Sequence, residues 1–470
     1  MTSEIVVIGA GPAGARLARR LGDAARVTVV GEESHAPYNR VLLAEVLAGR
    51  YGPEVIALPG VPVRRGVRAL AVDRDRRLVH CSDGAALRYD RLVLATGSNP
   101  VLPPLRGPGR VLPDGVHPFR TLDDCAALAA ATAVPGTRAV VVGGGLLGVS
   151  AARALAARGA KVVLAQQGEH LMERQLDPVA SALLRVHLEG LGVEVHTECR
   201  VRGLRTGGDG AVRAVVLADG FALDAEVVVL ACGVRPRVGL AVDAGLDVRR
   251  GIVVDDELRT SDPRIHAIGD CAEHDGVVHG LAGPALDQAD ALAGVLLAEI
   301  SGAGGPDAPG SGPGAAGPPA PPRYTGTRAL TRLTLAALPS LGPVDGPAPE
   351  APPGPAAAGP PPGTAPGPTG GPPTGPAPAP VPGPPPAPHP ALDIAAFGDP
   401  VPRPGDDVVQ LADATRGAYR KVVVREDRLV GGVLLGDLGA VGDLARAWEG
   451  DEALPASVPL LHLLTDDGGP

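Results

Sequence analysis

The opening segment, residues 4–14, constrains this chain more than any other stretch, and it reads E-I-V-V-I-G-A-G-P-A-G. An apolar run typical of a β-strand turns at once into a glycine pattern, and apolar residues then continue at helical spacing. In such a unit Gly9 permits the tight turn, Gly11 lets the backbone approach a pyrophosphate, and Gly14 lets the helix pack on the strand. Amide groups at the helix start, where the helix dipole is positive, then hold phosphates. The segment therefore predicts a dinucleotide site.

Two charged residues after the first helix extend this prediction. Glu32 follows a second apolar run, residues 26–30, at the distance where an acid accepts hydrogen bonds from a ribose diol; the alternative is an exposed charge after a strand. Arg40 could clamp a phosphate through two parallel hydrogen bonds or be a surface charge. Residues 54–90 predict short strands and turns. A further strand then closes on a small-residue turn at residues 95–97, which lets the backbone approach a flat cofactor.

The opening pattern then repeats in the middle of the chain. Residues 138–142 predict a strand, which is followed by G-G-G-L-L-G at residues 143–148, an alanine-rich helix and a strand over residues 161–164. Two copies of strand, glycine turn, helix and strand are hard to obtain by chance, so the chain is expected to hold two dinucleotides.

The two copies differ at the residue that would meet the ribose. Glu32 stands 23 residues after Gly9, and the same offset from Gly143 falls on Gln166. A carboxylate here accepts hydrogen bonds from an unphosphorylated ribose and repels a 2′-phosphate, whereas an amide can accept but repels nothing. The choice between NADH and NADPH is therefore open, and it leans to NADH because no basic residue directly follows Gln166.

Further candidate residues follow the second copy. Residues 193–233 predict strands and hairpins that finish on a small-residue turn at Gly233. A buried strand over residues 264–268 then delivers Asp270 beside Gly269. An acid at this place could hydrogen-bond the ribityl chain of a flavin, or it could be a helix N-cap.

A helix expected over residues 286–299 closes this region, and low complexity begins at about residue 302. Residues 303–322 and 340–390 are dominated by Pro, Gly and Ala. They are expected to be disordered, because such sequence buries too little apolar surface to offset the entropy of ordering it. A PxxP ligand is an alternative, although no basic residue flanks the core of the run.

Ordered-looking sequence surrounds the longer tract. Strands are expected at residues 328–335, 407–411, 420–424 and 429–435, and a helix at residues 438–448. They predict a small third domain with the 340–390 tract inserted in it, at a cost of only about 2 kcal/mol in loop-closure entropy. Trp448 is expected to pack in this domain, and the final twenty residues are expected to form a loose tail.

Composition argues against several functions. The net charge of −9 comes without a basic stripe, which argues against nucleic-acid binding. The five cysteines lie far apart and never form C-x-x-C, so no disulfide framework, iron–sulfur cluster or zinc site is expected, and they are interpreted as small buried hydrophobes in a reducing compartment. No signal-peptide pattern or membrane-length apolar run is found, so a soluble cytoplasmic protein is expected.

In combination, these motifs resemble the FAD-dependent pyridine-nucleotide oxidoreductase superfamily over most of residues 1–300. Three stretches resemble one branch, which comprises the large subunit of NADH-dependent nitrite reductase and the electron-transfer subunit of assimilatory nitrate reductase. They are Y-N-R-V-L-L at 38–43, L-M-E-R-Q-L-D at 171–177 and Y-R-K-V-V-V at 419–424. The resemblance implies FAD between the first and third motifs, NAD(P)H at the second, and a C-terminal lobe from about 323 to 450.

The chain also departs from these families. Full nitrite reductase large subunits continue into iron–sulfur and siroheme domains, and this chain lacks the cysteine ligands, so it is not expected to reduce nitrite alone. The cysteine pair of disulfide reductases and the single cysteine of peroxidase and oxidase relatives are missing from residues 35–60. Glu45 stands where ferredoxin-reductase relatives place a lysine near the flavin, which argues against a direct flavin contact there.

The expected fold is α/β, with two Rossmann-like dinucleotide-binding domains, for FAD and NAD(P)H, and a small α+β C-terminal domain interrupted by a disordered Pro/Gly/Ala-rich insertion. The expected boundaries are 1–115 for the first part of the FAD-binding domain, 116–239 for the NAD(P)H-binding domain, 240–300 for the second FAD-binding part, 301–322 for a linker, 323–450 for the C-terminal domain with 340–390 inserted, and 451–470 for the tail.

The functional hypothesis is an FAD-dependent NAD(P)H oxidoreductase that passes electrons to a separate acceptor protein in nitrite or nitrate assimilation. The acceptor would be a reductase subunit or a small iron–sulfur protein, and a homodimer is left open. One alternative is an oxidase or quinone-type reductase acting on a small acceptor. Another is a non-catalytic, flavin-bound interaction or sensor protein.

No catalytic side chain is assigned, because the cofactor supplies the chemistry and the protein supplies geometry. FAD is expected to be held by Gly9, Gly11, Pro12, Ala13, Gly14, Glu32, Arg40, Thr96, Gly97, Gly269 and Asp270. The nicotinamide coenzyme is expected to be held by Gly143, Gly145, Gly148, Gln166 and Gly233, and no metal site is expected.

Overall fold

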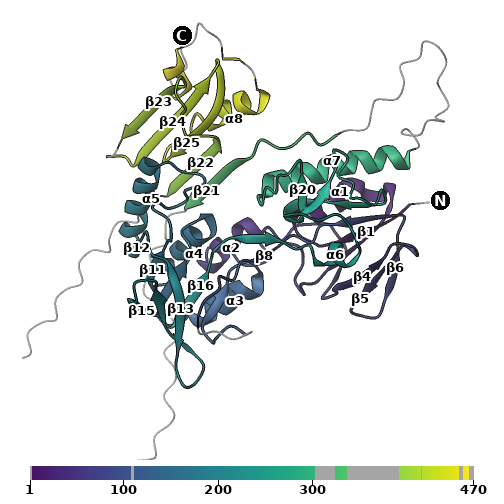
Figure 1. Ribbon diagram of the computed structural model, residues 1–470, viewed down its shortest axis with the longest axis horizontal. Coiled ribbons are helices and arrows are strands. Elements are labelled where there is room, and N and C mark those ends of the chain that lie inside the picture. Colours follow the sequence, from purple (N-terminus) through teal and green to yellow (C-terminus); the bar gives the residue numbers. More distant parts are fainter. Residues whose placement is uncertain are drawn as a thin grey trace, which may run out of the picture.

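The computed structural model describes residues 3–106, 111–301, 323–335, 391–413, 415–451, 453–454 and 459–464. The low-complexity tracts at 303–322 and 340–390, for which disorder is predicted, lie outside the described residues. Two parallel sheets and one antiparallel sheet organise the described chain, and Figure 1 shows the C-terminal sheet, in yellow, beside helix α5. The expected α/β fold with an added C-terminal domain is confirmed.

The first parallel sheet contains the opening strand at its centre. Its order is β19 (Ile265–Ala267), β7 (Arg91–Leu94), β1 (Glu4–Ile8), β2 (Arg26–Gly31) and β3 (Val63–Arg65). The residues of β1 that pair with both neighbours are buried, as expected for a parallel strand covered on both faces. Helices α1 (Pro12–Leu21) and α7 (Ala282–Ile300) pack against each other beside this sheet.

Helix α7 begins four residues before its predicted start at residue 286. Leu281, with extended backbone, precedes Ala282, and Pro284 lies within the first turn. A proline is tolerated there because the first amide groups of a helix have no partner inside it.

The second parallel sheet repeats the architecture of the first. Its order is β12 (Val193–His196), β11 (Lys161–Ala165), β10 (Arg138–Val142), β16 (Val227–Leu230) and β9 (Val116–Pro118). It is accompanied by helices α3 (Leu122–Ala131), α4 (Leu146–Ala157) and α5 (Pro178–Gly190), and by an antiparallel sheet of β13 (Val201–Thr206), β14 (Val212–Leu217) and β15 (Ala222–Asp224). Strand β10 coincides residue for residue with its prediction.

The remaining elements of this region are short. They are the sheet β4 (Ala69–Asp73), β5 (Leu78–Cys81) and β6 (Ala86–Arg88), the pairs β8 (Ser98–Pro100) with β17 (Val234–Pro236) and β18 (Ile252–Val254) with β20 (Ala272–His274), and the short helices η1 (Gly22–Ala24), η2 (Arg40–Leu42), α2 (Leu43–Leu47), α6 (Gly239–Asp243) and η3 (Gly269–Cys271). Strand β8 lies where the chain passes from the first parallel sheet to the second, and β17 lies where it returns, so the β8–β17 pair joins the two crossing segments.

The C-terminal sheet is antiparallel, in the order β21 (Leu330–Leu335), β22 (Leu392–Gly398), β25 (Arg428–Leu435), β24 (Ala418–Arg425) and β23 (Asp407–Asp413). Helix α8 (Val441–Gly450) packs on it, and Trp448 is buried with its ring centroid 5.4 Å from that of Phe397. The packing role predicted for Trp448 is confirmed. Strand β22 was not predicted, because it follows directly on the proline-rich tract.

Two expectations about surface and burial are wrong in part. The final residues are not only a loose tail, because η4 (Leu460–Leu463) is helical and Leu464 is fully buried in the C-terminal core. All five cysteines are free, but only Cys81, Cys125 and Cys271 are buried, whereas Cys199 and Cys232 are half-buried. Within the described ranges, no group of His, Cys, Asp or Glu could hold a metal ion, and no helix is long and apolar enough to cross a bilayer.

Candidate dinucleotide cleft

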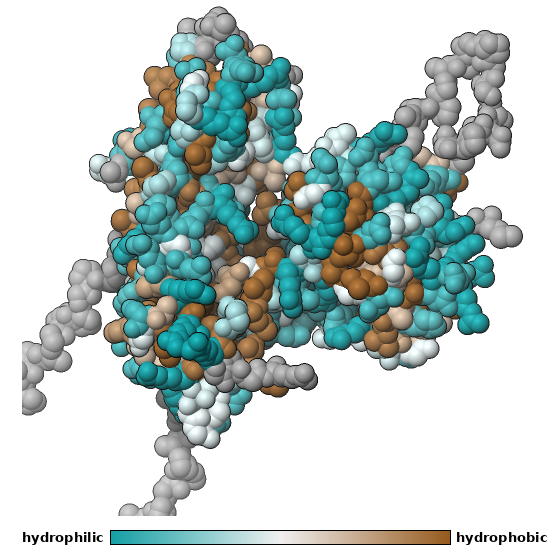
Figure 2. Space-filling view, viewed as in Figure 1, coloured by the Kyte–Doolittle hydropathy of each residue, from teal (hydrophilic) through white to brown (hydrophobic). Residues whose placement is uncertain are grey.

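Both glycine turns face one large cleft. Its volume is about 1880 Å³, and its lining includes Gly9, Gly11, Gly143 and Gly145. Strand β21 of the C-terminal sheet contributes to the same lining. Figure 2 shows the molecule hollowed between its two larger bodies, with apolar surface exposed in the hollow. The cleft therefore brings together the two predicted sites, which are more than 100 residues apart in the sequence.

The first turn has the shape that a dinucleotide phosphate requires. Gly9 has φ of +114°, and a Cβ there would collide with the carbonyl of Ala95. A Cβ on Gly14 would collide with the carbonyl of Gly9, which is the close helix–strand approach predicted for it. A Cβ on Gly11 would meet no atom within 4 Å, and Gly11 is the N-cap of α1. No side chain caps the first amide groups of this helix, so they can bind a phosphate in the cleft; we call each such glycine turn with its helix start a cradle.

The second turn reproduces this shape. Gly143 has φ of +109°, and a Cβ there would lie 2.5 Å from the carbonyl oxygen of Ala231. A Cβ on Gly148 would collide with the carbonyl of Gly143. Gly145 is open on its outer side and caps α4 without a side-chain bond. Both turns thus fit the phosphates of a dinucleotide, and their glycines hold the helix starts in the same way.

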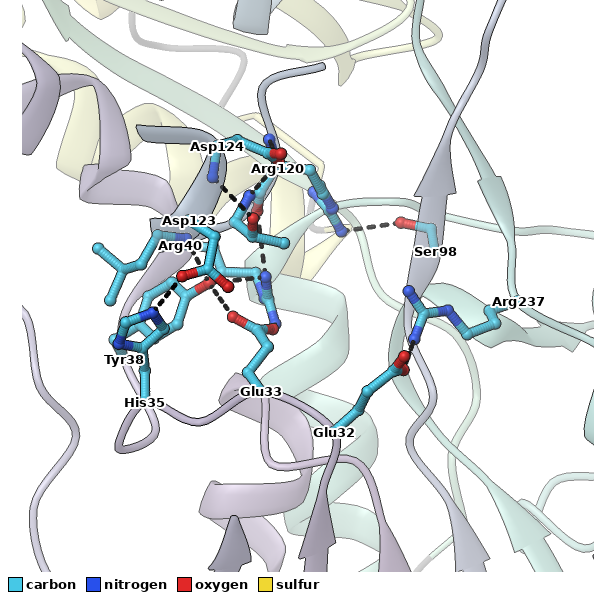
Figure 3. A network of polar contacts seen from close by, with 12 residues as sticks. Glu32, Glu33, His35, Tyr38, Arg40, Ser98, Arg120, Asp123, Asp124 and Arg237 are labelled. Atoms are coloured by element: carbon cyan, nitrogen blue, oxygen red, sulfur yellow. Dashed lines mark hydrogen bonds and ion pairs between the residues drawn. The ribbon is translucent and has the colours of Figure 1, made fainter. Parts of the chain in front are cut away.

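Glu32 stands at the end of β2 and lines the cleft, as predicted. Its carboxylate forms an ion pair with Arg68. It forms another, at 2.8 Å, with Nη1 of Arg237 (Figure 3). Arg68 directly precedes β4 and Arg237 directly follows β17, and both also line the cleft. Neither arginine was predicted, because no local pattern marks them.

Arg40 is held by a network of polar groups beside the cleft. Its Nη2 group pairs with Glu33, and its Nη1 group donates to the Tyr38 hydroxyl at 2.9 Å and to the Arg120 carbonyl at 3.1 Å (Figure 3). The Tyr38 hydroxyl in turn donates to Glu33 at 2.6 Å and accepts the Leu122 amide at 3.1 Å. Burial raises the pKa of Tyr38, so the phenol stays protonated and keeps donating. The network fixes the Arg40 guanidinium at the rim of the cleft, which it lines.

Asp270 lies in η3 and makes a three-membered cluster in the cleft. Its Oδ2 atom accepts from the Ser98 hydroxyl at 2.9 Å and from Nη2 of Arg120 at 2.5 Å, while Arg120 also donates to Ser98 at 2.8 Å. Asp270 caps no α-helix, so the alternative interpretation as a helix N-cap is wrong. Gly269 beside it is fixed by its amide, which donates to Gln288 at 2.7 Å.

Arg120 is placed by the start of helix α3. Thr121 and Asp124 form a reciprocal capping box, and the Arg120 amide also donates to Asp124 at 2.9 Å. Ser98 and Arg120 were missed by the sequence analysis, because their partner Asp270 lies 172 and 150 residues away. The capping box was a visible signal for the helix start, but nothing in the sequence showed which way Arg120 would turn.

The part of the cleft beside the second glycine turn contains Gln166 and Gly233. Gln166 follows β11, and its Oε1 atom accepts the Gly144 amide at 2.8 Å. Gly233 follows β16 with φ of +98° and lines the cleft. Thr96 and Gly97 line the opposite part, together with the remaining predicted residues of the first turn, Pro12 and Ala13. The structure thus brings all predicted site residues except Gly14 and Gly148 to the cleft surface, and those two pack beneath it. Their roles in holding cofactors stay predictions.

Glu45 does not line the cleft. Its carboxylate pairs with Arg153 of helix α4 and, at 3.7 Å, with Arg50. The Arg153 side chain is 2% exposed, and burial lowers the pKa of its guanidinium. Glu45 therefore joins the first half of the molecule to the second, which agrees with the argument against a direct flavin contact.

The thiols that line the cleft are not poised as nucleophiles. Cys199 and Cys232 both belong to the lining, and neither forms a disulfide. Burial raises the pKa of Cys232 to about 11 and also raises the pKa of Cys199. Because the thiolate is the reactive form, both groups are protonated and unreactive near neutral pH. The geometry argues against a thiol–disulfide relay.

Two glycine cradles that open on one cleft define the class of oxidoreductases that hold two dinucleotides together. Residues 3–289 match the family "Pyridine nucleotide-disulphide oxidoreductase", and residues 391–450 match the "Rubredoxin NAD+ reductase C-terminal domain". The chain belongs to the pyridine nucleotide-disulphide oxidoreductase family, and it is a flavin-dependent NAD(P)H oxidoreductase by class. The family implies FAD and NAD(P)H as bound groups.

Curated relatives agree with this assignment. The chain is 36% identical over 304 residues to the "Assimilatory nitrate reductase electron transfer subunit" of Bacillus subtilis, covering 62% of this chain and 38% of that protein. It is 36% identical over 283 residues to the ferredoxin–NAD(+) reductase component of the biphenyl dioxygenase system of Paraburkholderia xenovorans, covering 58% of this chain and 68% of that protein. The chain thus spans less than two fifths of the length of the nitrate reductase subunit.

A solved structure shows the same fold over nearly the whole chain. The covalent putidaredoxin reductase–putidaredoxin complex matches with a TM-score of 0.72 at 23% identity, covering 98% of both chains. The C-terminal sheet is therefore part of the shared architecture.

Proposed function

We propose that this protein takes reducing equivalents from NAD(P)H onto FAD and passes them to a separate acceptor protein, in nitrate or nitrite assimilation. FAD, when bound, supplies the chemistry of accepting a hydride and releasing electrons. The chain's own residues bind and orient the two groups in one cleft. The observation that carries the proposal is that both glycine cradles line the same cleft. NADH is the favoured donor, because no cation directly follows Gln166.

The residues of the cleft fit these two groups. The open amide groups at the starts of α1 and α4 would hold the two pyrophosphates. The Arg40 guanidinium and the Asp270 carboxylate would hold the phosphate and ribityl parts of FAD. The hydrogen bonds that Asp270 accepts from Ser98 and Arg120 hold its carboxylate in one orientation.

Transfer to another protein is supported by the chemistry of the cleft and by relatives. Cys199 and Cys232, which line the cleft, form no disulfide, and burial raises the pKa of both thiols, which argues against an internal disulfide as the acceptor. Relatives at 33–36% identity include an electron-transfer subunit and a putidaredoxin reductase, each of which is named for passing electrons onward. An acceptor protein with an iron–sulfur centre is therefore proposed.

An anaerobic titration of the purified protein tests the donor and the acceptor separately. NADH should bleach the bound flavin, and reoxidation should then require an added iron–sulfur protein or reductase subunit. Steady NADH consumption in air without a carrier would instead support a small acceptor. If neither NADH nor NADPH bleached the flavin, a non-catalytic role would be supported.

The FAD cradle itself is tested by Gly11→Val. A Cβ at Gly11 meets nothing within 4 Å, so the variant should fold while its side chain fills the space for the pyrophosphate. The purified variant should be colourless, as measured by absorbance near the flavin band. Gly208→Val, at an equally open glycine in the loop before β14, is the control and should stay yellow. A yellow Gly11→Val protein with full flavin occupancy would contradict the placement of the pyrophosphate.

A further inference from the structure

The second glycine turn carries an amide where the first carries an acid, and the structure shows how that amide is used. The Oε1 atom of Gln166 accepts a hydrogen bond of 2.8 Å from the Gly144 amide. Because a backbone N–H only donates, the side-chain atom that faces it must be the carbonyl oxygen. The Nε2 group, which only donates, is then left for an occupant of the cleft that Gln166 lines. Gln166 therefore presents a neutral hydrogen-bond donor and no charge.

The first turn provides a contrast within the same chain. Glu32 occupies the corresponding place after β2, and its negative charge is kept in the cleft by two ion pairs, with Arg68 and Arg237. A ligand with an additional phosphate on the ribose would meet this carboxylate. At the second turn Gln166 carries no charge, so it would not repel the 2′-phosphate of a ribose.

The neighbouring loop adds one charge of each sign. The Met172 amide donates to the Gly144 carbonyl at 2.9 Å, which fixes the loop on the glycine turn. Glu173 lines the cleft with an exposed carboxylate that accepts the His170 amide at 3.1 Å. Arg174 is also exposed and lines the cleft, and it forms no ion pair among the residues that the structure describes. The two charges offset each other, so the loop restores no net repulsion.

We propose that the coenzyme site does not reject a 2′-phosphate, so that the protein uses NADPH as well as NADH, and that Gln166 is the residue that sets this tolerance. The inference rests on the proposed function, because it assigns the occupant of the second cradle. Discrimination against NADPH depends on a repulsive group at the ribose, and neither Gln166 nor the net charge of Glu173 with Arg174 supplies one. The Nε2 group can donate equally to a ribose hydroxyl oxygen or to a phosphate oxygen.

Equilibrium binding to the FAD-loaded full chain tests this directly. Calorimetric titration with NAD⁺ and with NADP⁺ should give dissociation constants within about tenfold of each other, with NAD⁺ the tighter. Gln166→Glu should weaken NADP⁺ binding by about tenfold or more, because it places a carboxylate beside the phosphate, and should leave NAD⁺ binding within about threefold. The ratio of kcat/KM for the two reduced coenzymes should move in the same direction.

Gln410→Glu is the control, since it adds the same charge on an exposed side chain of β23 that does not line the cleft. It should change the ratio of the two dissociation constants much less than Gln166→Glu does. The inference is overturned if the wild type binds NAD⁺ more than about a hundredfold better than NADP⁺, or if both variants act equally. It is also overturned if Glu173→Gln produces the main gain in NADP⁺ binding, because Glu173 would then be the ribose acid. Failure of both coenzymes to bind would contradict the proposed function itself.

Discussion

A buried charged cluster joins the coenzyme half of the molecule to the C-terminal sheet, and removing its acid should destabilise that sheet. The Oδ2 atom of Asp177 accepts from the Tyr419 hydroxyl at 2.6 Å and from Nζ of Lys421 at 3.0 Å. Its Oδ1 atom accepts the Ala180 amide at 3.0 Å and so caps helix α5. Asp177 and Lys421 are each 8% exposed and Tyr419 is fully buried, so the cluster is shielded from water.

The perturbation is Asp177→Asn. Asparagine caps a helix as well as aspartate, so the Ala180 hydrogen bond can be kept while the charge and the acceptor for Tyr419 and Lys421 are lost. It leaves the Lys421 ammonium buried without its counter-charge, and breaking a buried pair in this way costs about 3–5 kcal/mol. Adding Lys421→Met should recover part of the loss, because an apolar replacement of both partners is often neutral or better.

The assay uses the single tryptophan of the sequence. Trp448 lies in the core of the C-terminal sheet, so its fluorescence during urea unfolding follows this domain. Asp177→Asn should shift the midpoint to markedly lower urea. Asp443→Asn removes a carboxylate from an exposed ion pair with Arg446 on α8 and should not shift the midpoint. Equal midpoints for the two variants would refute the reasoning, because they would show that the Asp177 cluster is solvated.

The contribution of Asp177 should also depend on pH. Burial by itself would raise the pKa of this carboxyl, but hydrogen bonds from Ala180, Tyr419 and Lys421 outweigh it and hold the pKa below its usual range. A depressed pKa gives stability that is present above the unfolded-state value of about 3.9 and is lost as the pH falls through the folded-state value. The difference between wild type and Asp177→Asn should therefore be full at pH 7 and should shrink in acid below about pH 4.

The other predictions concern the part of the cleft that we propose to hold FAD. Asp270→Asn leaves Arg120 without its counter-charge and removes the proposed ribityl contact, so the dissociation constant of FAD should rise by about tenfold or more, measured from the flavin fluorescence released on dilution. Unchanged retention of FAD would show that Asp270 does not contact the cofactor. Tyr38→Phe removes one of the hydrogen bonds to Glu33 and leaves the Leu122 amide without its acceptor, and it should lower stability by about 1–3 kcal/mol in thermal unfolding. Tyr51→Phe should cause no such loss, because the Tyr51 hydroxyl forms no hydrogen bond within the described residues and its ring, which lies under Arg50, is kept. Equal losses for the two variants would show that the hydrogen bonds of Tyr38 do not stabilise the fold.

The parts of the fold predicted from sequence are those fixed by local rules. Gly9 and Gly143 have φ values that residues with a side chain rarely adopt, and a Cβ at either position would collide with backbone atoms. Only glycine therefore fits at these two positions. The valine-rich run of β10 is buried on both faces, so its apolar sequence identified it without any alternation. The offset from the glycine turn to Glu32 and Gln166 is likewise set by one helix and one strand.

What the sequence could not supply is contact across the fold. Ser98 and Arg120 have no motif, and only the tertiary structure brings them to Asp270. Leu464 was assigned to a tail because short polar and proline-containing sequence precedes it, yet it is fully buried. In each case the deciding interaction joins segments that are far apart in the chain, where propensity and periodicity carry no information.

A short loop, residues 166–177, connects the second glycine turn with the C-terminal sheet. At one end the Gln166 side chain and the Met172 amide bind both polar groups of Gly144. At the other end Asp177 binds Tyr419 and Lys421, and strand β21 of the same sheet lines the cleft. Because each end is fixed by buried or backbone hydrogen bonds, the position of the C-terminal sheet and the shape of the coenzyme turn are determined together. The two stretches that resemble nitrite reductase, at residues 171–177 and 419–424, therefore meet in space, where Asp177 accepts hydrogen bonds from Tyr419 and Lys421.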